Sequence, residues 1–140
     1  MDLETVSAED FGQSLSGIGV NLLSPDVGAL VAFLTGIFDL TAHRVSADFA
    51  IIRHGDMMMQ IHADATYGAH PLLSLVPETP PRGGGLQLYL FGIDPDAAIA
   101  RATTLGHIVL EPAADKPHGL REATILSPEG YAFSPAMPKP

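Results

Sequence analysis

The chain has 140 residues and a formal net charge of −9 at pH 7, from 16 acidic and 7 basic residues. Nucleic acids and anionic membrane surfaces both attract clustered Lys and Arg, and this chain has no such cluster. Its composition therefore argues against both kinds of partner. Cysteine is absent, which excludes disulfides, thiolate metal sites and cysteine nucleophiles.

Hydrophobic residues make up 46% of the chain and charged residues only 16%. Apolar surface in this excess is commonly covered by a second subunit, so we expect a homodimer. The chain starts with an acidic segment, whereas a secretory signal peptide starts with a basic one. Its longest apolar stretch, residues 28–38, is shorter than the roughly 20 residues that span a bilayer. We therefore expect a cytoplasmic protein.

The first half of the chain reads as strand, helix and three strands. Residues 1–14 form a polar leader without a clear period, and alternation over residues 16–23 predicts a half-buried strand. Ser-Pro-Asp at residues 24–26 offers an N-cap, a proline and an early acid, and apolar residues at helical spacing follow to Asp39. Three further strands are predicted at residues 41–45, 48–53 and 57–62.

The second half repeats this order after a linker rich in proline and glycine, residues 63–84. Alternation at residues 86–91 predicts a strand, and the following helix opens at Asp94 and ends at Gly106. Three more strands are predicted at residues 107–110, 120–126 and 131–135. We therefore predict a single domain over residues 1–140, built from two βαβββ modules at residues 16–62 and 85–138 that share a core.

Five short segments, in this order and spacing, resemble motifs of one family. Asp-Pro-Asp-Ala-Ala at 94–98 resembles its strand-to-helix junction, and Gly106 its helix-terminating glycine. Residues 119–123 resemble its G-x-R strand, and Ser-Pro-Glu-Gly-Tyr at 127–131 resembles its D-P-[DE]-G-[YHN] turn, with Ser in place of Asp. Val-Ala-Phe-Leu at 31–34 resembles its A-x-F-Y helix. Over about residues 16–138 the chain is thus similar to the vicinal oxygen chelate superfamily, which includes glyoxalase I, extradiol dioxygenases and bleomycin-resistance proteins.

The resemblance implies an α+β fold in which two βαβββ modules form a curved, mixed-sheet cup with helices outside. Metal enzymes of the family place one ligand on the first and last strand of each module. Those positions match Gly19 (Gly17 in a cruder internal register), Gln60, Gln87 and Ser134. Glycine offers no side chain, and amide and hydroxyl oxygens are weak ligands for transition metals. We therefore expect no metal and no cofactor.

Our leading hypothesis is a metal-independent protein that binds a small molecule in the cup, similar to the bleomycin-resistance branch. The residues expected to line the site lie on strand faces opposite the helices: Gln60, His62, Gln87, Tyr89 and Ser134. All of them except Ser134 also have a purely structural interpretation. His62 could be a solvent-facing strand end, the two glutamines could satisfy each other, and Tyr89 could fill the core.

Two other functional classes stay open at this point, and no catalytic residue is identified. One is an enzyme, either a metal-dependent lyase or dioxygenase with displaced ligands such as His62 with Gln60 and Gln87, or a metal-free isomerase that uses His62 as its base. The other is a subunit or interaction module whose cup is filled and binds nothing.

Overall fold

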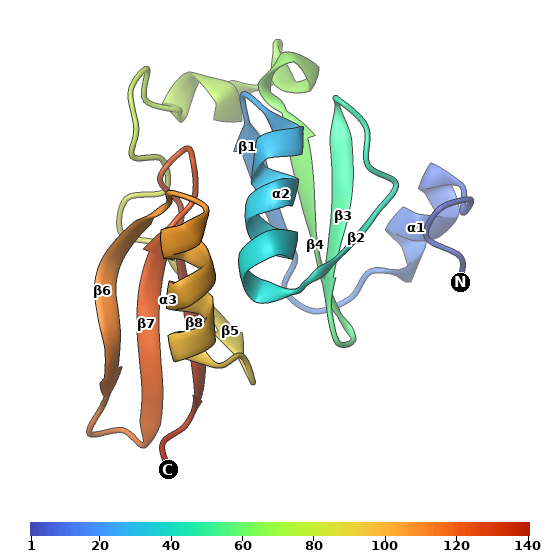
Figure 1. Ribbon diagram of the computed structural model, residues 1–140. Helices are drawn as coiled ribbons and strands as arrows, with labels where there is room; N and C mark the ends of the chain where they lie inside the picture. The colour runs from blue at the N-terminus through green and yellow to red at the C-terminus, as the bar shows by residue number, and fades with distance from the viewer. The chain divides into compact units, whose positions relative to one another are not determined.

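The computed structural model describes residues 1–140, which divide into two compact units. The first unit comprises residues 1–35 and 40–75, and the second comprises residues 36–39 and 76–140. Each unit holds one four-stranded mixed sheet, and the order βαβββ occurs twice along the chain (Figure 1). The predicted α+β class and the two modules are therefore confirmed. That the modules form one domain stays a prediction.

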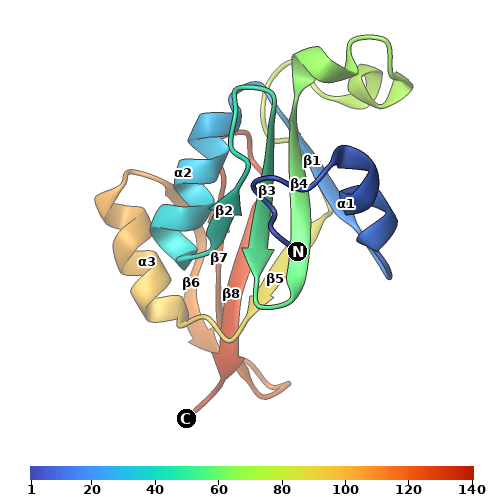
Figure 2. The same cartoon turned by 90° about the vertical axis from the view of Figure 1, so that its right-hand side faces the viewer.

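Sheet A, in the first unit, has the strand order β1-β4-β3-β2. Strands β1 and β4 run parallel, and the other pairs are antiparallel. Helix α2 covers one face of this sheet (Figures 1 and 2). The elements are β1 (Val20–Ser24), α2 (Val27–Phe38), β2 (Thr41–His43), β3 (Phe49–His54) and β4 (Met57–Ala63).

Two details of the first module differ from the predictions. The first strand begins at Val20, not at residue 16, and Ile18 is 88% exposed instead of contributing to a buried face. The N-cap of α2 is Asp26, whose Oδ1 accepts a hydrogen bond from the Ala29 amide (3.0 Å). Ser24 instead accepts from the Asp26 amide (3.1 Å) and so fixes the turn before the helix.

The N-terminal leader contains a helix that the sequence analysis missed, α1 (Ala8–Ser14). Ser7 caps it, because its hydroxyl accepts from the Asp10 amide (3.0 Å). A serine followed three residues later by an acid is a helix-start pattern, so a local signal was present. The helix has no apolar period because Phe11 is its single buried residue.

Sheet B, in the second unit, has the order β5-β8-β7-β6, and α3 packs against β6, β7 and β8. The predicted helix limits are confirmed: Asp94 caps α3 and Gly106 follows it with φ 80°. The two short helices η1 (Asp64–Tyr67) and η2 (Pro71–Leu75) lie in the predicted linker. The elements of the second module are β5 (Gln87–Phe91), α3 (Pro95–Thr104), β6 (Ile108–Asp115), β7 (Leu120–Leu126) and β8 (Ala132–Pro138).

Strand β6 is about twice as long as predicted and lies at the edge of sheet B. Its pairing with β7 shifts register between Val109 and Glu111 and again between Glu111 and Ala114. These irregularities break the two-residue alternation on which the sequence prediction depended.

None of the helices has the length and apolarity that crossing a membrane requires.

Candidate functional site

One face of sheet B points away from α3 and carries polar and aromatic side chains. Arg121 identifies the opposite face, because its guanidinium donates to both carboxylate oxygens of Asp96 in α3 (2.8 and 2.9 Å). Successive residues of a strand alternate between faces, so the neighbours of Arg121 point to the face opposite α3. With the cross-strand register, that face carries Gln87, Tyr89, Phe91, Glu122, Thr124, Ala132, Ser134 and Ala136.

Three neutral polar side chains on this face are hydrogen-bonded in a row. The Gln87 amide donates to the Ser134 hydroxyl (2.9 Å), and the hydroxyl groups of Ser134 and Thr124 share a hydrogen bond (2.8 Å). Ser134 is fully buried and Thr124 nearly so, whereas Gln87 is exposed. The row therefore leads from the surface into the sheet, and its outer end is free to contact a ligand.

A second polar group on the same face centres on Glu122, which the sequence analysis did not single out. Tyr89 donates its hydroxyl to Glu122 Oε1 (3.4 Å), and His118 Nε2 lies 3.7 Å from the same oxygen. Glu122 is only 7% exposed, and its Oε2 is buried without a hydrogen-bond partner. Desolvation and the Glu122 carboxylate raise the pKa of Tyr89, so this hydroxyl remains a donor.

Aromatic rings complete this face. Tyr89 and Phe91 are stacked with centroids 5.3 Å apart and planes 4° from parallel, and they are 37% and 58% exposed. Rings exposed to this extent do not fill a core. They offer a flat apolar surface beside the polar row, which suits a planar or apolar ligand.

The first unit brings together Gln60 and His62, which point to the same side of β4. Across β1 the residue opposite Gln60 is Asn21, so neither Gly19 nor Gly17 occupies that place, and both glycines precede the strand. His62 Nδ1 lies 2.7 Å from Asn21 Oδ1, and the Asn21 amide nitrogen donates to the Tyr67 hydroxyl (2.8 Å). An amide oxygen only accepts, so in this arrangement His62 carries its proton on Nδ1.

The His62 ring is also held from its sides. The Phe49 ring meets it edge-on at 4.9 Å, and the Tyr67 ring lies 5.3 Å away. Burial of the imidazole lowers the pKa of His62, because the charged form loses hydration. His62 is therefore neutral at pH 7, with its Nε2 lone pair available as an acceptor or base. Asn21 and Tyr67 escaped the sequence analysis because their partners lie 41 and 46 residues away.

A cavity of about 310 Å³ adjoins Gln60 in the first unit. Its walls come from α1, the segment before β1, and the hairpin of β3 and β4. The lining residues are Phe11, Ser14, Leu15, Ser16, Gly17, Ile18, Gly19, Val20, Asp56, Met57, Met58 and Gln60. The cavity is mostly apolar, and Gln60 supplies an amide donor and acceptor at its wall.

The residues at the four positions where the resemblance predicts metal ligands do not fit a divalent transition metal. The resemblance assigns them to Gly19, Gln60, Gln87 and Ser134, but in the structure the residue of β1 that pairs with Gln60 is Asn21, so the side chains to consider are those of Asn21, Gln60, Gln87 and Ser134. All are neutral, and the Ser134 hydroxyl is already hydrogen-bonded on two sides. Zinc and related metals prefer imidazole, thiolate and carboxylate ligands. No group of three or more His, Asp or Glu side chains is arranged to hold a metal ion.

No protein-family model matches the sequence, and no curated protein is detectably similar to it. Solved structures do match. A glyoxalase/bleomycin resistance protein/dioxygenase family enzyme from Burkholderia phytofirmans PsJN is 17% identical, with a TM-score of 0.71 over 86% of this chain and 97% of that one. TioX from Micromonospora sp. ML1 is 21% identical (TM-score 0.62, 89% and 98% covered).

A lactoylglutathione lyase from Agrobacterium tumefaciens is 17% identical, with a TM-score of 0.63 over 87% of this chain and 92% of that one. Identities this low show a shared fold and not a shared activity. The similarity to the vicinal oxygen chelate superfamily predicted from short motifs is thereby confirmed at the level of the fold. The chain has the fold of the glyoxalase/bleomycin resistance/dioxygenase proteins.

Proposed function

We propose that the chain is a metal-independent protein that binds a small molecule. Gln60 and His62 line the binding surface in the first unit, and Gln87, Tyr89 and Ser134 line the one in the second. The observation that supports this most is the chemistry of Asn21, Gln60, Gln87 and Ser134, whose neutral amides and hydroxyl stand in place of metal ligands. Such groups orient a ligand by hydrogen bonds but hold a metal weakly.

The proposal includes a homodimer in the cytoplasm. Large apolar side chains remain exposed in the second unit, among them Phe91 (58%), Ile108 (64%) and Leu110 (61%). Exposed apolar side chains on this scale favour association with a second copy of the chain. Sedimentation velocity tests this, and a monomer at micromolar concentration would remove the dimer from the proposal.

Purified protein incubated with zinc, nickel, manganese or iron(II) and then desalted should hold far less than one metal ion per chain. The physical reason is that four neutral oxygen donors do not offset the hydration of a divalent ion. Elemental mass spectrometry measures the content directly. One metal ion per chain that survives desalting would refute the proposal of a metal-independent protein. Loss of that metal in His62→Ala would then show that the imidazole is one of its ligands.

A metal-free enzyme is the second candidate, because the Asn21–His62 hydrogen bond presets the imidazole as a base. We expect nitrogen-detected NMR to show His62 as the Nδ1–H tautomer with a pKa below about 6.5, the usual value for histidine. The basic form then persists to lower pH than in an ordinary histidine. Asn21→Ala should restore the Nε2–H tautomer that exposed histidines favour. An Nε2–H tautomer in the unmodified protein would argue against a preset base.

A further inference from the structure

The N-terminal segment, residues 1–19, covers part of the face of sheet A that carries Gln60. Helix α1 lies on the side of the sheet opposite to α2 (Figures 1 and 2). Phe11 is 6% exposed although every other residue of α1 is exposed. The same Phe11 lines the cavity together with Met58 and Gln60 of β4. The helix is therefore held on the sheet by one aromatic side chain, which forms a wall of the cavity.

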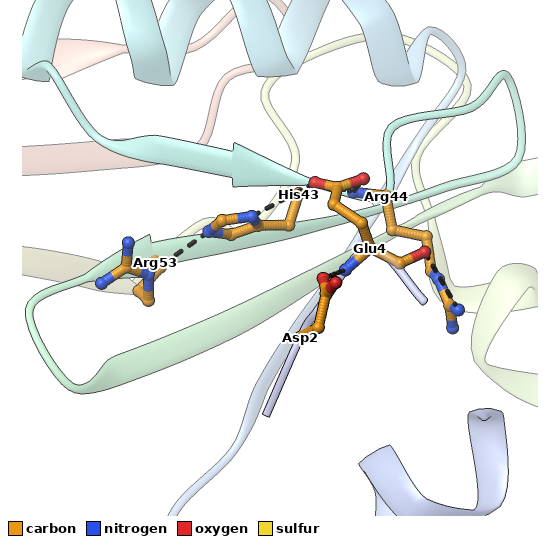
Figure 3. Close-up of polar contacts among 5 residues, drawn as sticks. All are labelled: Asp2, Glu4, His43, Arg44 and Arg53. Carbon is orange, nitrogen blue, oxygen red and sulfur yellow. Dashed lines mark hydrogen bonds and ion pairs between the residues drawn. The ribbon is translucent and has the colours of Figure 1, made fainter. Parts of the chain in front are cut away.

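Glu4 fastens the beginning of this segment to the end of β2. Its two carboxylate oxygens accept hydrogen bonds from the Arg44 amide (3.1 and 3.0 Å), and its carbonyl accepts from the Arg44 guanidinium (3.3 Å). Glu4 Oε1 also lies 3.2 Å from His43 Nδ1. Figure 3 shows these contacts, which we call the Glu4 latch.

The latch reaches further into sheet A through His43. Arg53 Nε donates to His43 Nε2 (3.3 Å), so the proton of the neutral ring is on Nδ1 and points to Glu4 (Figure 3). Arg44 has a φ of 53°, an unusual conformation for a residue with a side chain, and its amide faces the Glu4 carboxylate. All contacts of the latch are at least partly exposed, so each is individually weak and the latch can open.

Two cavities lie beneath the segment and share Ser14, Asp56 and Met58 as lining residues. The cavity beside Gln60 has a volume of about 310 Å³, and the one beside the latch about 550 Å³. The segment ends in a stretch that contains Gly17, with φ 75°, and Gly19; a side chain at either would meet nothing within 4 Å. Glycines at the end of a covering element can absorb the backbone rotation that moves it.

The lining of the smaller cavity limits what it can hold. It contains large apolar side chains, the Gln60 amide, the hydroxyls of Ser14 and Ser16, and one charged group, Asp56, and no Lys, Arg or His. An anionic ligand would lose hydration there and would meet the negative charge of Asp56 with no positive charge to offset it. A neutral, largely apolar molecule with one hydrogen-bonding group fits, because Gln60 can donate to it or accept from it.

We propose that residues 1–19 are a movable roof over a binding site for a neutral, mostly apolar ligand, with Phe11 as its inner wall and the Glu4 latch as its fastening. This rests on the proposed binding function and adds the ligand class and the route of entry. The ligand enters when the latch opens and the segment swings about Gly17 and Gly19.

Two fluorescent probes that differ by one charge test the ligand class. N-phenyl-1-naphthylamine is neutral and carries one N–H donor for the Gln60 oxygen, and 8-anilinonaphthalene-1-sulfonate adds an anionic sulfonate to the same rings. We expect the neutral probe to bind at least about tenfold more tightly. Phe11→Ala and Gln60→Leu should each weaken it by about tenfold, through lost apolar contact and a lost hydrogen bond.

Opening of the roof is tested separately through Glu4→Gln, which removes the negative charge of the latch. Stopped-flow fluorescence should show the neutral probe entering and leaving several-fold faster, and hydrogen exchange of the Arg44 amide should accelerate. Glu9→Gln is the matched control, because Glu9 is an exposed carboxylate of α1 that takes no part in the Glu4 latch and accepts a hydrogen bond from the Gln13 amide (3.3 Å). It should change neither rate.

The outcomes separate the roof from the binding function. If Gln60→Leu abolishes probe binding but Phe11→Ala and Glu4→Gln change nothing, the roof is refuted and the proposed function stands. If the neutral probe fails to bind at all, or binds equally after Gln60→Leu, both the site and the binding function proposed for this face are refuted. Tighter binding of the sulfonate probe would overturn the assignment of a neutral ligand.

Discussion

Replacing Gly130 by alanine should destabilise the protein by about 2–4 kcal/mol, the sum of backbone strain and a steric overlap. Gly130 has a φ of 96°, which L-residues rarely adopt. An added Cβ would lie 2.6 Å from Pro81 Cα and 2.7 Å from Pro81 Cβ. The segment at residues 81–82 cannot easily retreat, because the Arg82 amide donates to the Glu129 carbonyl (2.8 Å).

Gly92→Ala is the control for this effect. Gly92 also has a positive φ, 81°, but an added Cβ would meet nothing within 4 Å. It should therefore cost only the conformational penalty, about 1–2 kcal/mol. Urea unfolding measures the free energy of unfolding of both variants. If both lose the same amount, the close contact of the added Cβ with Pro81 does not contribute to the destabilisation.

Ser134→Ala should lower the free energy of unfolding by about 1–3 kcal/mol, because it removes the hydroxyl to which two other polar side chains are hydrogen-bonded. Ser134 is fully buried, and its hydroxyl is shared by the Thr124 hydroxyl (2.8 Å) and the Gln87 amide (2.9 Å). The exposed Gln87 can turn to water. Thr124, at 7% exposure, cannot, so most of the loss comes from the Thr124 hydroxyl.

The double variant Thr124→Val/Ser134→Ala separates stability from function. With both hydroxyls gone, neither substituted position leaves a buried hydroxyl without a partner, and the double variant should be nearly as stable as the unmodified protein. Equilibrium unfolding measures the coupling between the two sites. If the double variant loses as much free energy of unfolding as the two single variants together, this account is contradicted. A stable double variant that no longer binds ligand would show that the row is kept for binding.

The second module could be predicted closely because its signals are local. Asp94 caps α3 and Gly106 ends it with the positive φ that favours glycine. At the predicted turn, Ser127 accepts from the Tyr131 amide (2.9 Å), which explains why serine serves there. The start of β1 was placed too early because the alternation of residues 16–19 has no neighbouring strand to pair with, and pairing is a property of the folded sheet.

For the candidate site, the sequence could predict only which side chains share a face of one strand. Alternation places Gln87 and Tyr89 together, and likewise Gln60 and His62. The partners that decide their chemistry come from distant parts of the chain, as Asn21 does for His62 and Glu122 for Tyr89. A single sequence carries no local signal for contacts that span more than 30 residues. Glu122 could have been noticed as a carboxylate on the same face as Thr124 within an apolar strand.

The irregular edge strand β6 has a consequence for solubility in concentrated solution. An exposed edge strand is a template on which further chains can add and form fibrils. In β6 two register shifts bend the ladder, and Pro112 supplies no amide hydrogen for an incoming strand. That edge of sheet B is thus poorly suited to continued growth, even though Ile108 and Leu110 expose apolar side chains nearby. The same register shifts that obscure β6 in the sequence therefore make the addition of a further strand to this edge less favourable.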